Sequence, residues 1–194
     1  MIFEFGTFKV DVDVERTRRF YETVEDQLGC ECAGCRNFRK AYPLLPDAVQ
    51  AFFRQLGVDI GKPAEATAYN SYDGNLTFYD GFYHICGTIL ESPRLYIKTD
   101  EQHTQLDRNA IVALTADYGF YFTDRCGLVD EDFPTPVIQL EIQGNIPWVL
   151  NEPNPYFYPG PQPTYGKNEG TRYEELKRQR ISKPENANGR SSCQ

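Results

Sequence analysis

The residues best suited to chemistry are three cysteines crowded into six positions, in the stretch Cys30-Glu-Cys32-Ala-Gly-Cys35. Zinc prefers soft ligands that converge tetrahedrally, and a C-x-C-x-x-C spacing can wrap three thiolates round one ion. Gly34 permits the tight backbone path that such a turn requires. The spacing therefore indicates a zinc-binding turn, and the alternative is a set of inert, partly buried reduced thiols.

A structural zinc site needs a fourth ligand, which the three cysteines do not supply. Two histidines and two cysteines elsewhere in the chain are candidates, although none has a diagnostic spacing: His84, Cys86, His103 and Cys126. The expected cofactor is a structural zinc held by Cys30, Cys32 and Cys35 and by one of these four residues.

Cys32 and Cys35 also have the C-x-x-C spacing of a redox pair. Cys32 would precede a helix whose N-terminus lowers a thiol pKa. Thioredoxin-like pairs, however, follow a strand in a βαβ unit, whereas a helix precedes this motif. The surroundings therefore favour the metal site over the redox pair.

Nucleophilic catalysis would need a base beside a cysteine or serine, and the chain has only His84 and His103. His84 shares one face of a predicted strand with Phe82 and Cys86, which is typical of a core histidine. His103 lies in a polar stretch that is typical of a solvated loop. No nucleophile elbow, Walker motif or dinucleotide fingerprint occurs. We therefore expect no catalytic residues, and a thiol-dependent or metal-assisted hydrolase is the alternative.

Helices are predicted on both sides of the cysteine cluster. The apolar spacing predicts one helix over about 14–27, with Gly29 as its stop, and a short one over 36–42 that Pro43 ends. A third helix is predicted over 46–56, because its apolar residues form one stripe and Gly57 follows it.

The remaining periodicity is that of strands. Residues 2–12 alternate as in a half-buried strand, with Gly6-Thr7 as a bulge or hairpin turn. Further strands are predicted over 76–79, 82–86, 96–97, 111–114, 118–122 and 137–142, with Asp80-Gly81 as a tight turn or as part of one bulged strand. This order predicts an α+β fold, a mainly antiparallel sheet with the N-terminal helices packed on one face.

The composition changes after Leu150. Six prolines lie between Pro147 and Pro163, and such a segment forms neither a helix nor a central strand. We expect residues 1–150 to form a single α+β globular domain and residues 151–194 to be a Pro-rich, extended polar tail with a short helix at 171–181.

The charge is acidic and unevenly spread. The formal net charge is −8; residues 151–194 hold seven Lys/Arg and five Asp/Glu, which leaves 13 basic and 23 acidic residues in 1–150. An acidic body repels phosphate backbones, so nucleic acid is an unlikely partner, and mimicry of nucleic-acid charge is a second alternative function.

No apolar run is long enough for a bilayer, no secretion signal is recognisable, and six cysteines are too few for a disulfide scaffold. These features predict a cytoplasmic protein with reduced thiols and no membrane contact, and they leave its oligomeric state open.

Three stretches carry a resemblance: Cys30-Glu-Cys-Ala-Gly-Cys-Arg-Asn-Phe38, Leu56-Gly-Val-Asp-Ile-Gly-Lys-Pro-Ala-Glu65 and Ile146-Pro-Trp-Val-Leu150. With these stretches the chain resembles a group of small uncharacterised bacterial and prophage-type proteins over most of residues 8–150. The resemblance implies a bacterial cytoplasmic protein and brings no assigned activity.

The expected function is a non-enzymatic protein-binding or regulatory domain stabilised by zinc. Tyrosines and phenylalanines occupy both faces of the predicted strands, so that one face can form core while the other presents tyrosines. Tyrosine gives contact area at low entropic cost, which suits a protein-binding surface. The expected partner is another protein, contacted through the Tyr-rich sheet or the Pro-rich tail.

Overall fold

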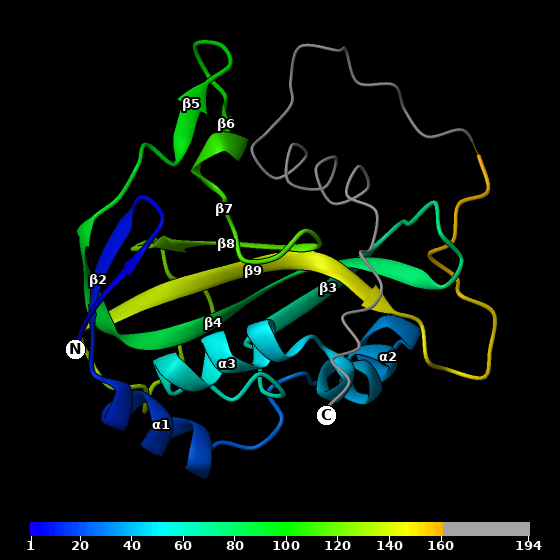
Figure 1. Cartoon of the computed structure of the whole chain (residues 1–194), viewed down its shortest axis with the longest axis horizontal. Coiled ribbons are helices and arrows are strands. Elements are labelled where there is room, and N and C mark those ends of the chain that lie inside the picture. The colour runs from blue at the N-terminus through cyan, green and yellow to red at the C-terminus, as the bar shows by residue number, and fades with distance from the viewer. Residues whose placement is uncertain (161–194) are drawn as a thin grey trace, which may run out of the picture.

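Three helices lie along one face of an antiparallel sheet in the computed structural model, which describes residues 1–160 (Figure 1). The helices are α1 (Val14–Thr23), α2 (Ala33–Ala41) and α3 (Asp47–Leu56), and a 3-10 turn, η1 (Tyr42–Leu44), connects the last two. The predicted α+β fold, with N-terminal helices on one face of a mainly antiparallel sheet, is confirmed.

The sheet has seven strands, all paired antiparallel. Six follow the order β1 (Ile2–Phe5), β2 (Phe8–Val12), β4 (Leu76–Glu91), β9 (Val137–Pro147), β8 (Tyr118–Thr123) and β7 (Val112–Ala113), and β3 (Glu65–Tyr69) also pairs with β4. Strands β5 (Tyr96–Lys98) and β6 (Thr104–Leu106) form a separate hairpin, followed by a second 3-10 turn, η2 (Arg108–Ala110).

Strand β4 is the longest element, with 16 residues. It pairs with β9 over Leu76–Cys86, and its other edge pairs first with β3 and then with β2. The tight turn proposed for Asp80-Gly81 is therefore wrong, and the continuous-strand alternative is correct. A Cβ on Gly81 would lie 2.6 Å from the Glu65 carbonyl oxygen, so the glycine permits β3 to approach closely and does not make a turn.

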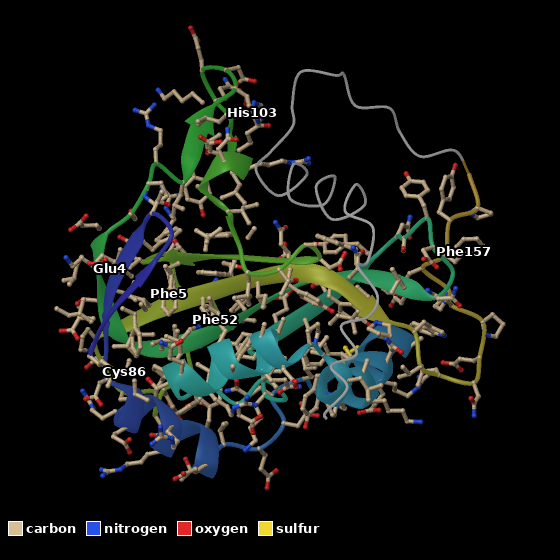
Figure 2. The ribbon with its side chains drawn as sticks, viewed as in Figure 1. Glu4, Phe5, Phe52, Cys86, His103 and Phe157 are labelled. Carbon is tan, nitrogen blue, oxygen red and sulfur yellow. The ribbon has the colours of Figure 1, made fainter. Side chains whose placement is uncertain are left out.

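The two ends of the sheet curl towards each other. Gly6 makes the turn between β1 and β2 with a φ of +60°, and a Cβ there would lie 2.9 Å from the Val112 methyl carbons in β7. The Phe5 ring contacts Phe52 of α3 and Phe120 of β8, with centroids 5.1 and 5.9 Å apart (Figure 2). Aromatic edge-to-face packing thus joins the sheet ends and α3 in one core.

Helix α3 follows its prediction closely. Val49, Phe52, Phe53 and Leu56 are buried, and Gly57 ends the helix with a left-handed φ of +76°. Helix α1 is shorter than predicted, because it ends at Thr23 and the chain turns at Val24 into an extended conformation. The Asp26 carboxylate accepts from the Leu28 N–H, and Leu28 enters the core, so residues 24–32 form a loop.

Residues 151–160 contain no helix, and Phe157 forms an isolated parallel β-bridge with Ser71. The helix predicted at 171–181 lies outside the described residues. Within residues 1–160, no helix is both long and apolar enough to cross a membrane.

Candidate metal centre

The cysteine cluster sits where the loop after α1 enters α2. Helix α2 begins three residues before its predicted start, and Cys32 is its N-cap, with an extended backbone (φ −66°, ψ 164°). The Cys32 Sγ accepts a hydrogen bond from the Cys35 N–H at 3.5 Å. A sulfur thus takes the place of the oxygen that usually caps a helix.

The sulfur atoms of Cys30, Cys32 and Cys35 all lie within 4.8 Å of one another, so the structure brings the three predicted ligands together. With zinc–sulfur bonds of about 2.3 Å, a tetrahedral ion separates its sulfurs by about 3.8 Å. Small side-chain rotations would therefore let one ion contact all three. Cys30 and Cys32 are exposed and Cys35 is buried, so the cluster opens to the surface.

The local electrostatics favour a thiolate at Cys32. The hydrogen bond from the Cys35 N–H lowers the pKa of Cys32 to about 7, and the neighbouring thiols and Tyr156 act in the same direction. Burial raises the pKa of Cys35 to about 12, and the neighbouring sulfurs add to this. A bound cation would reverse the effect on Cys35, because a metal ion deprotonates the thiols that coordinate it.

Two tyrosines enclose the turn. The Tyr79 hydroxyl donates to the Gly34 carbonyl oxygen at 2.8 Å, and Tyr156 lies beside both Gly34 and the Cys32 sulfur. A Cβ on Gly34 would lie 2.8 Å from the Ala68 Cβ. The turn is therefore packed between β3, β4 and the segment that follows β9.

Two arginines of α2 hold the loop that carries Cys30. Arg39 donates to the carbonyl oxygens of Cys30, at 3.0 Å, and of Leu28, and its Nε lies 2.5 Å from the Asp26 carboxylate. Arg36 donates to the Glu31 carbonyl oxygen at 2.7 Å. These bonds fix the loop backbone on the side of the cluster that faces solvent.

The buried candidates for a fourth ligand lie elsewhere. His84 is 2% exposed, its Nε2 is 2.8 Å from the Gly127 carbonyl oxygen, and its ring contacts Phe82 and Phe133. Burial lowers the pKa of His84. The Cys86 backbone N–H donates to Thr17 Oγ1 at 3.0 Å, which places this residue beside α1.

The two other candidates are also outside the cluster. The His103 Nδ1 is 2.9 Å from the Asp100 carboxylate, on the loop of the β5–β6 hairpin (Figure 2). The Cys126 Sγ donates to the Val137 carbonyl oxygen at 3.8 Å. Over residues 1–160, the cysteine group holds Cys30, Cys32 and Cys35 alone, so none of the four expected fourth ligands joins it. The sixth cysteine, Cys193, lies outside the described residues.

A segment beyond β9 lies beside the cluster, which the sequence pattern did not predict. Residues 152–158, named the strap below, return to the body of the protein: the Ser71 N–H donates to the Tyr156 carbonyl oxygen and the Tyr158 N–H to the Ser71 carbonyl oxygen, both at 2.8 Å. The Glu152 carboxylate pairs with Arg36 at 2.5 Å. Nothing in the sequence pattern pointed to Tyr156, because prolines on both sides of it indicated only extended chain.

Fold and site together define an α+β protein with a three-cysteine surface cluster at the start of a helix. No family model matches the chain, and no curated protein and no solved structure matches it either.

Proposed function

We propose that this chain is a non-enzymatic binding protein that holds one zinc ion between Cys30, Cys32 and Cys35. The observation that supports it most directly is the mutual approach of the three sulfurs to within 4.8 Å. Zinc prefers thiolate ligands, and the hydrogen bond to Cys32 favours its thiolate form.

The ion would join the loop to α2. Cys30 belongs to the loop, whereas Cys32 and Cys35 belong to the helix start, so a shared ion restrains one against the other. A zinc ion with three protein ligands keeps one position for a further ligand. Because Cys30 and Cys32 are exposed, water or a ligand from a partner has access to that position.

Exposed aromatic residues near the strap support the binding of another protein. Four of them are between 38% and 50% exposed: Tyr69, Tyr72, Phe157 and Tyr158. The Tyr72 and Tyr158 rings contact each other with centroids 5.8 Å apart, so strap and β3–β4 loop form one aromatic surface. Exposed apolar groups gathered in this way are typical of protein-contact surfaces.

The position of His84 supports the binding protein over a hydrolase. A general base must reach the nucleophile, whereas His84 is buried among aromatic rings and its Nε2 is engaged by Gly127. His103 lies on an exposed hairpin loop beside Asp100. Neither imidazole belongs to the cysteine group.

Metal analysis tests the zinc site. The full chain, expressed with zinc and purified without chelators, should contain about one zinc per chain by mass spectrometry of the metal. Cys30→Ser, Cys32→Ser and Cys35→Ser should each lower that content strongly, whereas Cys126→Ser and His103→Ala should not. Zinc-free wild-type protein, or full zinc content in the triple serine variant, would refute the site.

Pull-down from cells of the source organism tests the binding surface. A protein that copurifies with the wild type should be lost with a Tyr69→Ser, Tyr72→Ser and Tyr158→Ser triple variant. Leu44→Ser is the matched control, because Leu44 is 64% exposed and belongs to η1, outside this aromatic surface. Equal recovery with both variants would contradict a role for these tyrosines.

A further inference from the structure

Two cysteines at the start of α2, one helical turn apart, differ in their exposure to solvent. Cys32, the N-cap, is exposed, and Cys35, in the first turn, is 6% exposed. The N-cap side chain turns back over the first turn, where its sulfur accepts from the Cys35 N–H at 3.5 Å. Both sulfurs therefore lie on the same side of the helix start, within 4.8 Å of each other.

We infer that Cys32 and Cys35 are also a dithiol that exchanges with disulfides when no metal is bound, with Cys32 as the attacking and Cys35 as the resolving sulfur. This inference does not rest on the zinc proposal, because it concerns the metal-free cluster. It adds a chemical activity to a protein proposed above to be a binding protein.

Exposure assigns the two roles. The attacking sulfur must be accessible to a disulfide substrate, and Cys32 is exposed whereas Cys35 is buried. The N–H of Cys35 and the helix N-terminus both place positive partial charge at the Cys32 sulfur, which stabilises the negative charge of Cys32 as the attacking thiolate. The two sulfurs already lie within 4.8 Å of each other, and a disulfide would bring them to about 2.05 Å.

The reaction balances with a low-molecular-weight disulfide as the oxidant. The Cys32 thiolate attacks one sulfur of the disulfide, a mixed disulfide forms on Cys32, and the first thiolate leaves. Cys35 then gives up its proton and attacks the Cys32 sulfur, and the second thiolate leaves and takes that proton. Two electrons pass from the cysteine pair to the oxidant, which ends as two reduced thiols.

Cys30 is the natural rival within the cluster. It is exposed, and its sulfur accepts from the Cys32 N–H at 3.4 Å, but it lies in the loop before the N-cap. Its sulfur also lies within 4.8 Å of the Cys35 sulfur, but Cys30 is not the N-cap of α2, whose sulfur accepts the Cys35 N–H. The cysteine that is found joined to Cys35 therefore separates the roles of Cys30 and Cys32, and serine at position 32 retains a good N-cap.

The test uses the full chain with Cys193→Ser, reduced and freed of metal with EDTA, and treated with oxidised glutathione. Peptide mass mapping should find a disulfide between Cys32 and Cys35. Cys35→Ser should stop at glutathione on Cys32, Cys32→Ser should leave Cys35 reduced, and the matched control Cys126→Ser should react like its parent. A disulfide that includes Cys30, or no glutathione on Cys32 in the Cys35→Ser variant, would overturn the inference.

Zinc content, measured on the same preparation before EDTA, separates the two proposals. Zinc-free isolates that form the Cys32–Cys35 disulfide would refute the zinc site and support the exchange activity. Zinc-loaded isolates whose metal-free form gives no such disulfide would refute the exchange activity alone. Circular dichroism of every variant ensures that a lost product does not reflect lost folding.

Discussion

The Tyr156 hydroxyl lies over Gly34, 2.8 Å from the point where a Cβ on that residue would stand. Tyr156 of the strap and Gly34 of the helix start are thus in close contact, and position 34 has no room for a larger side chain. Through this contact, the cysteine turn and the strap form one packed unit, although they are far apart in the sequence.

Gly34→Ala should therefore destabilise the protein. The new methyl group would meet both the Tyr156 hydroxyl and the Ala68 Cβ at 2.8 Å, which forces α2 away from β3 or displaces the strap. Overpacking of this kind costs about 1–3 kcal/mol, measurable by urea unfolding. Gly29→Ala is the control, because nothing lies within 4 Å of its Cβ position; an equal loss in both variants would contradict the packing argument.

Asn37→Ala should loosen the junction between α2 and the end of β9. The Asn37 amide, fully buried, donates to the Pro147 carbonyl oxygen at 3.0 Å and accepts from the Val149 N–H at 2.8 Å. Each group left unpaired in a buried place costs about 1–3 kcal/mol. Urea unfolding should show a loss of about 2 kcal/mol or more, whereas the exposed Asn109→Ala should show almost none. A loss below about 0.5 kcal/mol would show that water replaces the amide.

Glu141 should make the protein less stable as the pH rises. Burial, helped by the nearby Asp80 and Glu65 carboxylates, raises the pKa of Glu141 from its ordinary 4.5 to about 7, although the hydrogen bond from Gln139 acts in the opposite direction. Because the folded state favours the protonated form, the stabilisation is full below pH 4.5 and is lost as the pH rises through about 7. Glu141→Gln should remove this part of the pH dependence of the unfolding free energy. The exposed Glu131→Gln should leave it unchanged, and a Glu141→Gln curve parallel to the wild type would refute the assignment.

His84, in contrast, should make the protein less stable as the pH falls. Burial lowers its pKa below the ordinary 6.5, so the folded state favours the neutral imidazole. The stabilisation is present above about pH 6.5 and is lost as the pH falls through the lowered value. Nuclear magnetic resonance of the His84 imidazole should therefore show a titration midpoint below 6.5. A midpoint at or above 6.5 would contradict the effect of its burial.

Periodic segments were predictable, and those that depend on distant partners were not. Residues 46–57 carry an apolar stripe and a glycine stop, both local signals, and α3 matches them. Helix α2 begins earlier than predicted because a cysteine, which is not a usual cap, receives the N–H of Cys35. Strand β6 has no alternating apolar pattern, and β3 alternates only through the small Ala66 and Ala68, so pairing with β5 and β4 places these two strands.

Of the site, the three-cysteine cluster was predictable from the sequence and the strap was not. The spacing of Cys30, Cys32 and Cys35 pointed to a shared centre, because ligands so close in sequence meet through local geometry. The strap could not be found in this way. Tyr156 reaches the cluster through hydrogen bonds between backbone groups of the strap and Ser71, and such contacts leave no mark in a local pattern.

The arrangement of β4 has a consequence for synthesis on the ribosome. Strand β2 is synthesised well before its partner residues 87–91 in β4, and the second edge of β4 is covered only after residues 137–147 are made. The β1–β2 hairpin therefore emerges long before its place in the sheet exists. Slow translation over 92–136 should prolong the time during which a nascent β4 presents an open edge to other chains.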